Sequence, residues 1–428
     1  MGFAKTFEND RGAALVIALM FLAIVALAGS TAVILTSTDI QIGSNYKSSS
    51  SAFYNADAGV NFALAKMKAG LTANPKTFQL PTVVWDPDNP TDPNSFTVLT
   101  SAPFAAPAGF SFSYEAPGVT MIANNIFTFT AIGANPDDTE AQAVITATFS
   151  PSGLFNYGIF GDLGVTLSGN GRTDSYDSSA GPYTWATHNN EGDVGTNAIT
   201  AGAISLSGNA KVYGDAMAGK GGNPATCVTT SGNAAVVPPG QKLAADEQKD
   251  MPAITDPGGG TNIPAWNLSG NSSDTLSGGT YRLPGISITA NATGTISGHV
   301  ILYVTGNINI SGNGNLVIPA GSSLTIYASG SVSISGNGIS NNTGYPKNLQ
   351  IYGTSTCNSV TVSGNGNVYG AIYAPSATVS VTGNGDIYGS VIGRTIAIPG
   401  NGNVHYDEDL QNTGPISGLK LLTWKQES

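Results

Sequence analysis

The sequence has little charge, little cysteine and little histidine. Only 10% of its 428 residues are charged, and the formal net charge is −11. The 16 Lys and Arg residues form no cluster of the kind that a phosphate-binding surface needs, so nucleic acid is excluded as a partner. Two cysteines and three histidines provide no zinc-type spacing, and neither a metal site nor a cofactor is predicted.

The two cysteines, Cys227 and Cys357, lie far apart in the chain. In an exported protein they could form one disulfide. Two unrelated thiols in a cysteine-poor chain are the alternative, and the sequence leaves both open.

The N-terminus contains the longest apolar run. Residues 13–35 (AALVIALMFLAIVALAGSTAVIL) carry no charge and are long enough to cross a hydrocarbon core of about 30 Å as a helix. A polar leader, residues 1–12, precedes the run, and a polar helical stretch follows it to residue 73. The sequence therefore predicts one helix over residues 13–73 whose first part, residues 13–35, spans a membrane once.

Two segments of this region carry a family resemblance. The start RG-AALVIALMFLAIVALAGS and the later AFYNADAGV together resemble the N-terminal region of PilX-type minor pilins, over about the first 70 residues. The resemblance implies that a prepilin peptidase cuts between Gly12 and Ala13 and that the new N-terminus is methylated. The matching positions of the second segment, with Asp where Glu is usual, are Phe53, Tyr54, Ala56, Asp57, Ala58 and Gly59.

One position departs from major pilins, which usually carry Glu at mature position five. This chain has Ile17 there. An intramembrane carboxylate is costly unless a neighbour pairs with it, so Ile17 suits a tip or minor subunit better than a repeating shaft subunit. A plain membrane anchor outside any filament is the alternative.

A small β module is predicted over residues 74–153. Alternating runs occupy residues 96–99, 110–114, 126–132 and 143–149, and Asn135-Pro136-Asp137-Asp138 suits a hairpin turn. We expect an antiparallel sheet that buries the apolar stripe of the helix.

A repeat dominates residues 154–410. Its unit has alternating β-branched or apolar residues followed by Gly-Asn-Gly, as in VTVSGNG (360–366) and VSVTGNG (379–385). Alternate residues such as Val379 and Val381 share one face of a strand, and Gly-Asn-Gly permits a turn. Stacked units would form a parallel β-helix, also called a β-solenoid.

The repeat is interrupted around residues 215–265 by Pro-rich and charged sequence, which we interpret as a surface insertion with a possible short helix over residues 242–250. Residues 411–428 are predicted to be a C-terminal tail. The closing run of the repeat resembles an uncharacterised Gly-Asn-rich domain found behind PilX-like heads, which brings no known activity.

The recurring Asn of the turns suggests two structures. The side chains could stack as a hydrogen-bonded ladder, or Asn could simply be a good turn residue. The positions concerned are Asn313, Asn337, Asn365, Asn384 and Asn401.

Three tyrosines occupy matching places in Val/Ile-Tyr-Gly: Tyr213, Tyr369 and Tyr388. The preceding Val or Ile follows the core pattern, so alternation predicts that the tyrosines face outward. They would then form an aromatic stripe suited to glycans or another protein. Structural cladding is the alternative.

Catalytic groups are sparse in the repeat. Between residues 301 and 400 the charged side chains are Lys347, Asp386 and Arg394, whereas glycan-cleaving β-helices need paired carboxylates or acids around a metal. The acidic run 405–409 (HYDED) is explained as well by a solvated end of the domain as by a metal site. We predict that the protein is not an enzyme.

The sequence thus predicts a mainly β protein with a long N-terminal helix, a small antiparallel module and a C-terminal parallel β-helix. The expected function is that of a minor pilin-like component of a type IV pilus or related filament, used in assembly or adhesion. Its expected location is the bacterial inner membrane and then the pilus or cell surface. Its expected partners are other pilins, the assembly machinery and the prepilin peptidase. A tethered surface adhesin and a cell-surface carbohydrate-active enzyme are the alternatives.

Overall fold

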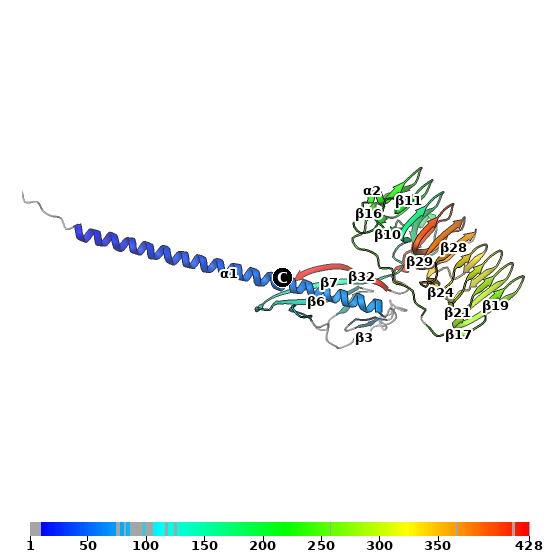
Figure 1. Ribbon diagram of the computed structural model, residues 1–428, viewed down its shortest axis with the longest axis horizontal. Helices are drawn as coiled ribbons and strands as arrows, with labels where there is room; N and C mark the ends of the chain where they lie inside the picture. The colour runs from blue at the N-terminus through cyan, green and yellow to red at the C-terminus, as the bar shows by residue number, and fades with distance from the viewer. Residues whose placement is uncertain are drawn as a thin grey trace, which may run out of the picture.

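A computed structural model describes residues 10–73, 78–80, 83–85, 97–98, 106–115, 119–123, 126–256, 258–364, 367–412 and 416–427. It contains a long helix, a small antiparallel sheet and a parallel β-solenoid, as the sequence predicts (Figure 1). The first half of the helix projects from the rest of the molecule, the sheet lies along its second half, and the solenoid lies beyond the end of the helix.

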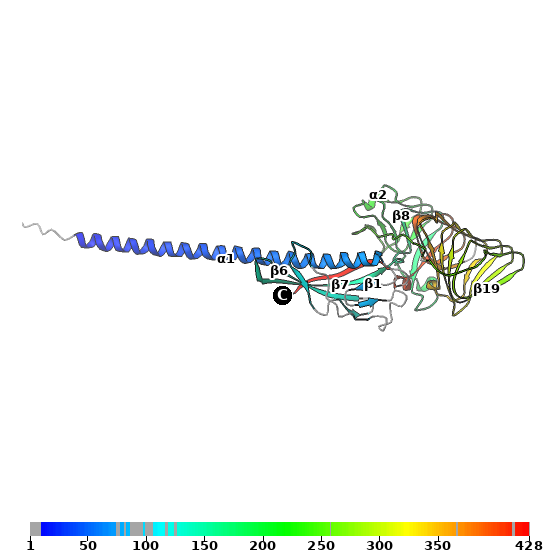
Figure 2. The ribbon, with the colours of Figure 1, turned by 60° about the horizontal axis from the view of Figure 1, so that its bottom comes forward.

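Helix α1 (Asp10–Ala73) is a single rod without a proline. None of the other described elements lies around its first half, and its second half lies along the sheet in both views (Figures 1 and 2). The buried side of the second half consists mainly of small residues, which allow the helix to approach the strands closely. They are Ala52, Ala56, Val60, Ala63 and Met67.

The sheet that covers the helix has the order β32-β7-β6-β4, with β5 also paired to β6. Its central hairpin joins β6 (Ile126–Asn135) to β7 (Asp138–Gly153) at the predicted turn, with Asn135 opposite Asp138. Phe127 and Phe129 are buried against the helix on alternate positions of β6. The other strands are β4 (Phe112–Tyr114) and β5 (Thr120–Ala123), and a separate small sheet has β1 (Phe78–Leu80), β2 (Val83–Trp85) and β3 (Thr97–Val98).

The predicted C-terminal tail is wrong. Residues 416–427 form β32 (Ile416–Glu427), which pairs antiparallel with β7 from Gly153 to Val144. The solenoid is therefore inserted between two adjacent strands of one sheet. Sequence reasoning missed this because the pairing partner lies more than 260 residues away.

The solenoid winds through three-sided coils whose strands pair in parallel. In its first chain segment the strands are β8 (Ile159–Leu167), β9 (Arg172–Tyr176), β10 (Val194–Thr196), β11 (Ile204–Leu206), β12 (Lys211–Val212), β13 (Ala216–Ala218), β14 (Val228–Thr230), β15 (Ala235–Val236) and β16 (Lys242–Ala244), with helix α2 (Pro224–Cys227) at one corner.

The second chain segment of the solenoid contains more and longer strands. They are β17 (Thr261–Asn262), β18 (Trp266–Leu268), β19 (Ser273–Leu283), β20 (Ile286–Ile288), β21 (Thr293–Val304), β22 (Ile308–Ile310), β23 (Asn315–Ile318), β24 (Ser323–Ala328), β25 (Val332–Ile334), β26 (Gly338–Asn341), β27 (Leu349–Gly353), β28 (Ser359–Gly364), β29 (Val368–Gly383), β30 (Ile387–Ile398) and β31 (Val404–Asp407).

The coils do not stack in chain order. The first strand, β8, pairs with β10 and β11 on one side and with the late strand β30 on the other. The chain therefore enters at the middle of the stack and winds to one end at β16. It then crosses to the far end at β17 and winds back until β31 lies beside β9 (Figure 1).

The predicted insertion at residues 215–265 is wrong for most of its length. Strands β13 to β16 lie there and pair with their neighbours in the solenoid sheet. The predicted helix at residues 242–250 is also absent, and β16 begins at Lys242. Among the described residues of this range, those of the crossover between β16 and β17 leave the coils, because the crossover must travel the length of the stack.

Inward residues of the coils form one continuous apolar core, including Val379 and Val381 as predicted. The turns carry the asparagine ladder: Asn313 Nδ2 donates to Asn291 Oδ1 at 2.9 Å, and Asn401 Nδ2 donates to Asn384 Oδ1 at the same distance. The ladder continues across the junction of the two segments through Asn170. Asn337 donates to the main-chain oxygen of Asn313, and Asn365 lies outside the described residues.

Candidate functional site

The first half of α1 has an apolar surface that no other element covers in the part of the chain that the structure describes. Its large apolar side chains between Val16 and Ile42 are 52% to 71% exposed. One stretch of the helix is long and apolar enough to cross a membrane. A contiguous apolar surface of this size marks a membrane or protein contact. We call residues 16–42 the stem.

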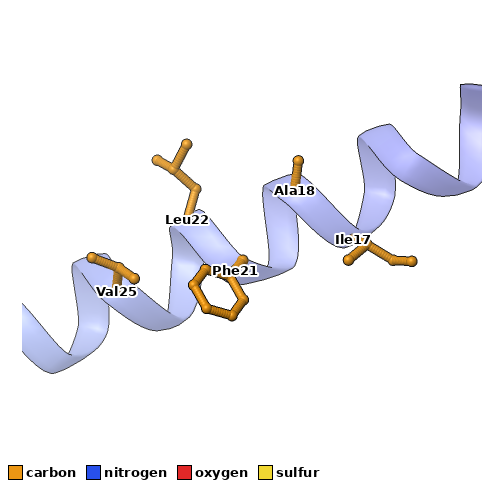
Figure 3. A pocket seen from close by; sticks show the side chains of 5 residues that line it. All are labelled: Ile17, Ala18, Phe21, Leu22 and Val25. Atoms are coloured by element: carbon orange, nitrogen blue, oxygen red, sulfur yellow. The ribbon is translucent and has the colours of Figure 1, made fainter.

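The start of the stem has two rows of side chains with a shallow groove between them. Figure 3 shows Ile17, Phe21 and Val25 along one side of the helix, four residues apart, and Ala18 and Leu22 along the other. Rows at this spacing are the ridges that fit into grooves of neighbouring helices. Ile17, at mature position five, is thus an ordinary part of this apolar surface and is 65% exposed.

The predicted processing site lies in the first turn of α1. Gly12 and Ala13 are helical, two residues after the helix begins at Asp10. Cleavage between them remains a prediction.

The family-like segment 53–59 is where α1 meets the sheet. A Cβ added to Gly133 of β6 would lie 2.1 Å from the main-chain nitrogen of Ala56, so helix and strand touch backbone to backbone there. Gly59 is buried under Phe112, and Tyr114 Oη donates to the carbonyl of Gly59 at 2.8 Å. The small residues of the segment are therefore needed for close packing.

The polar and aromatic residues of the same segment hold other strands. Asp57 Oδ1 accepts a hydrogen bond of 3.2 Å from Trp424 Nε1 of β32, and the Phe53 ring meets the Trp424 ring edge to face at 5.7 Å. Tyr54 is 70% exposed, and Ala58 is half-buried. The Asp that replaces the usual Glu thus anchors the C-terminal strand to the helix.

Sequence reasoning missed a contribution from Asn55 in this segment. Its Nδ2 donates to the carbonyl of Ala134 at 2.9 Å, and its Oδ1 accepts from the main-chain nitrogen of Ser111 at 3.2 Å. The available signal was a polar Asn between the Phe-Tyr pair and the small residues of this segment.

The three predicted tyrosines lie in one column on an outer face of the solenoid. The strand register places Tyr369 beside Tyr388, and Tyr388 beside His405. His405 lies beside Asp174, and the pairing of β12 with β9 brings Tyr213 to the far side of Asp174. The tyrosines point away from the core as predicted, but His405 and Asp174 separate Tyr213 from the other two.

The tyrosine column is partly covered, and at Tyr388 the structure favours the alternative of structural cladding over an exposed aromatic surface. This residue is only 8% exposed, because Tyr183, from the loop after β9, packs against its ring at 5.5 Å and against His405 at 3.9 Å. Tyr369 stacks on Tyr388 at 4.3 Å and, like Tyr213, remains half-exposed.

Trp185 and His188 lie beside Tyr213 at the other end of the column. Their rings stack at 4.1 Å, and the guanidinium of Arg172 lies 4.3 Å from the Trp185 ring centre. Trp185 is 47% exposed. This exposed aromatic group was not predicted, and its signal was the aromatic spacing of YTWATH in a loop.

Within this column, His405 and two carboxylates form an ion network between strands from the beginning and the end of the solenoid sequence. His405 Nδ1 lies 2.5 Å from Asp174 Oδ1, and its Nε2 lies 3.6 Å from Asp386 Oδ2. Burial acts to lower the pKa of His405, but the hydrogen bonds and charges of the two carboxylates outweigh it and raise that pKa. For Asp386 burial acts upward, and the contact with His405 outweighs it, so its pKa is lowered. The network stabilises the junction between coils.

A second outward column of tyrosines was missed altogether. Successive coils align them through the strand register, and the crossover covers them, with Tyr373 Oη donating to the carbonyl of Pro252 at 2.8 Å. The available signal was the repeated Ile/Leu-Tyr in ILYV, TIYA, QIYG and AIYA. The four are Tyr303, Tyr327, Tyr352 and Tyr373.

Of the two alternatives that the sequence leaves open for the cysteines, the structure has the unpaired thiols. Cys227 and Cys357 are both free and buried. They precede strands β14 and β28, which are five strand pairings apart in the stack. At about 4.8 Å per pairing this is far beyond the ~7 Å that a disulfide can span. Among the residues that the structure describes, no group of three His, Cys, Asp or Glu could hold a metal ion.

Comparison with known protein families finds two matches. Residues 11–61 match the family described as PilX N-terminal. The chain carries a PilX-type pilin N-terminus. Residues 245–413 match a domain of unknown function, DUF7305, which therefore covers the crossover and the second chain segment of the solenoid behind that N-terminus.

Three solved structures with detectable similarity are distant from this chain in sequence. The competence-associated pilin ComZ from Thermus thermophilus is 13% identical, with 89% of this chain and 97% of that chain covered, at a TM-score of 0.27. A glycosylated ice-binding protein from an Arctic yeast is 15% identical (59% and 90% covered, TM-score 0.24). An ice-binding protein domain from Shewanella frigidimarina is 13% identical (59% and 95% covered, TM-score 0.26). No curated protein matches the chain by sequence.

Proposed function

We propose that the protein is a minor pilin-like subunit of a type IV pilus or related filament, anchored by α1 and displaying the solenoid outside the cell. The observation that carries this proposal is the bare stem joined to a PilX-type segment. Residues 16–29 of the stem are apolar on all sides, which suits lipid before assembly and neighbouring helices afterwards.

The attachment of the head supports this role. Two connections join the solenoid to the sheet, one after β7 and one before β32, and Trp424 of β32 also contacts α1. Leu154 and Phe155, just after β7, are fully buried against the solenoid. A head held in this way would move with its helix rather than swing on a flexible tether.

Ile17 supports a minor or tip position. A carboxylate at this point would have to be paired in the membrane, and Ile17 removes that need. The expected partners are the inner membrane, the prepilin peptidase, other pilins and the assembly machinery. The half-exposed Tyr369 and Tyr213 are the candidate contacts for adhesion to glycans or proteins.

Mass spectrometry of the mature N-terminus tests the proposal. Cells that express the full chain with its pilus system should yield a chain that begins at methylated Ala13 and is recovered in the sheared surface fraction. Gly12→Leu should block cleavage and remove the chain from that fraction, whereas the leader variant Gly2→Ala should behave like the parent. A parent chain that keeps Met1 at the surface would refute filament entry and favour a tethered adhesin.

A further inference from the structure

Two side chains from distant parts of the chain meet at the entrance of the solenoid. The Nζ of Lys249, on the crossover, contacts the Oδ1 of Asn156, on the connection after β7, across 93 residues of sequence. Two aromatic rings form the surroundings: Nζ lies 5.5 Å from the ring centre of Tyr157 and 5.7 Å from that of Phe160. An amine and a carboxamide are thus held together beside apolar walls.

Both groups are fixed by their backbones. Asn197 donates from Nδ2 to the carbonyl of Lys249 at 2.9 Å and accepts at Oδ1 from the nitrogen of Lys249 at 2.9 Å. On the other side, Asn156 follows the fully buried Phe155, and Tyr157 Oη donates to Met217 Sδ at 3.2 Å. Groups held in contact in this way react as if at very high concentration.

The amine is also prepared for reaction. Burial lowers the pKa of Lys249 to about 7, although the charge of Asp250 opposes the shift. In a large fraction of molecules Lys249 is therefore a neutral amine at neutral pH. A lysine whose pKa is lowered in this way is a nucleophile, whereas a lysine with its ordinary pKa remains a protonated cation at neutral pH.

We propose that Lys249 and Asn156 form an intramolecular amide cross-link. The Nζ of Lys249 attacks the Cγ of Asn156, a bond forms between these atoms, and the bond from Cγ to Nδ2 breaks. The proton lost by the amine passes to the leaving nitrogen, which departs as ammonia, so no oxidant or reductant is needed. Asp250 follows Lys249 in the chain and its charge acts on Lys249, and we assign the transfer of that proton to its carboxylate.

The cross-link would secure one end of the solenoid. The loop that it closes contains every strand from β8 to β16, which is the segment that winds to the free end of the stack. This part of the head has no disulfide, because Cys227 is free. A covalent link between the entrance and the crossover would prevent these coils from unwinding under load.

Peptide mapping of the full chain in detergent is the test. The parent should give one branched peptide that joins Asn156 to Lys249, in place of two linear peptides, and an intact mass lower by one ammonia. The mass alone does not decide, because Asn-Gly pairs such as Asn313-Gly314 also lose ammonia when they form succinimides. Recovery of linear peptides with an unmodified Lys249 from the folded parent chain would overturn the proposal.

Two variants serve as controls. Lys249→Arg keeps the positive charge but removes the primary amine, so the branched peptide should be absent. On denaturing gels the parent should migrate faster than this variant, because a closed loop makes the unfolded chain more compact. Asn156→Asp offers a carboxyl group instead of the amide, and a branched peptide formed from it should be lighter by one water. Equal migration of parent and Lys249→Arg would contradict the cross-link.

Discussion

Gly133→Ala should separate the sheet from α1, because the added methyl group has no room between strand β6 and the helix. The added Cβ would lie 2.1 Å from the nitrogen of Ala56 and 2.2 Å from the carbonyl of Ala52. Ordinary contacts begin at 3.4 Å, so helix and strand must separate by more than 1 Å. The obstacle is backbone, and no side-chain rotation can relieve it.

The cost follows from the packing that is lost. A gap of this size removes a quarter to a half of the dispersion energy at each affected contact, and Val60 and Met67 are among the buried residues concerned. Overpacking of this kind costs about 3 kcal/mol, at the upper end of its usual range. The loss should be local, because the solenoid has its own core.

Hydrogen exchange of the full chain in detergent measures this effect. The amides of β6 and β7 should exchange faster in Gly133→Ala, by roughly the hundredfold that about 3 kcal/mol implies, while β20 to β28 should be unchanged. The matched control is Gly43→Ala, a helical position with nothing within 4 Å of the added Cβ, which should stabilise the helix by up to about 1 kcal/mol. Equal exchange of β6 in the parent and Gly133→Ala would refute backbone contact between α1 and β6.

Three further predictions concern the junction, the C-terminal strand and the ladder. The pKa of His405 is raised in the folded chain. Protonated His405 therefore stabilises the fold fully below about pH 6.5, and this contribution is lost as the pH rises through the folded pKa. Urea titrations at several pH values should show this loss, and His405→Gln should abolish it. Burial raises the pKa of Asp407 to about 6, so the free energy of unfolding also falls as the pH rises toward this value. The His405→Gln variant should retain this second part of the pH dependence. Trp424→Phe should cost about 1 kcal/mol by removing the hydrogen bond to Asp57, whereas Asp57→Asn keeps an acceptor and should cost less; equal urea midpoints for the two would argue against this bond. Asn313→Ala should cost about 1 kcal/mol by removing one rung of the ladder, and an unchanged midpoint would show that Asn acts there only as a turn residue.

The elements themselves could largely be predicted because their signals are local. A charge-free run of helical length, alternation in the strand from Ile126 and the repeated Gly-Asn corner each lie within a few residues, and the structure contains all three elements. The outward direction of Tyr369 and Tyr388 also followed from alternation. Alternation says nothing about what covers a face, and the loop that carries Tyr183 therefore went unpredicted.

The errors share a different cause. The return of β32 to β7, the pairing of β8 with β30 and the contact of Lys249 with Asn156 each join residues that are distant in sequence. A sequence repeat does not determine which strands become neighbours, because parallel strands with similar repeats can pair in many orders.

The sequence by itself determined that the chain has an apolar helical stem, a small sheet and glycine-cornered coils, because these depend on the size, polarity and dihedral freedom of neighbouring residues. Only the tertiary structure decided that the coils close in the middle of the stack, that the C-terminus returns to the helix at Trp424, and that His405 lies between two carboxylates. These features depend on contacts between residues that are distant in sequence. An unpaired strand edge or a buried charge needs a partner, and that partner can lie anywhere in the chain.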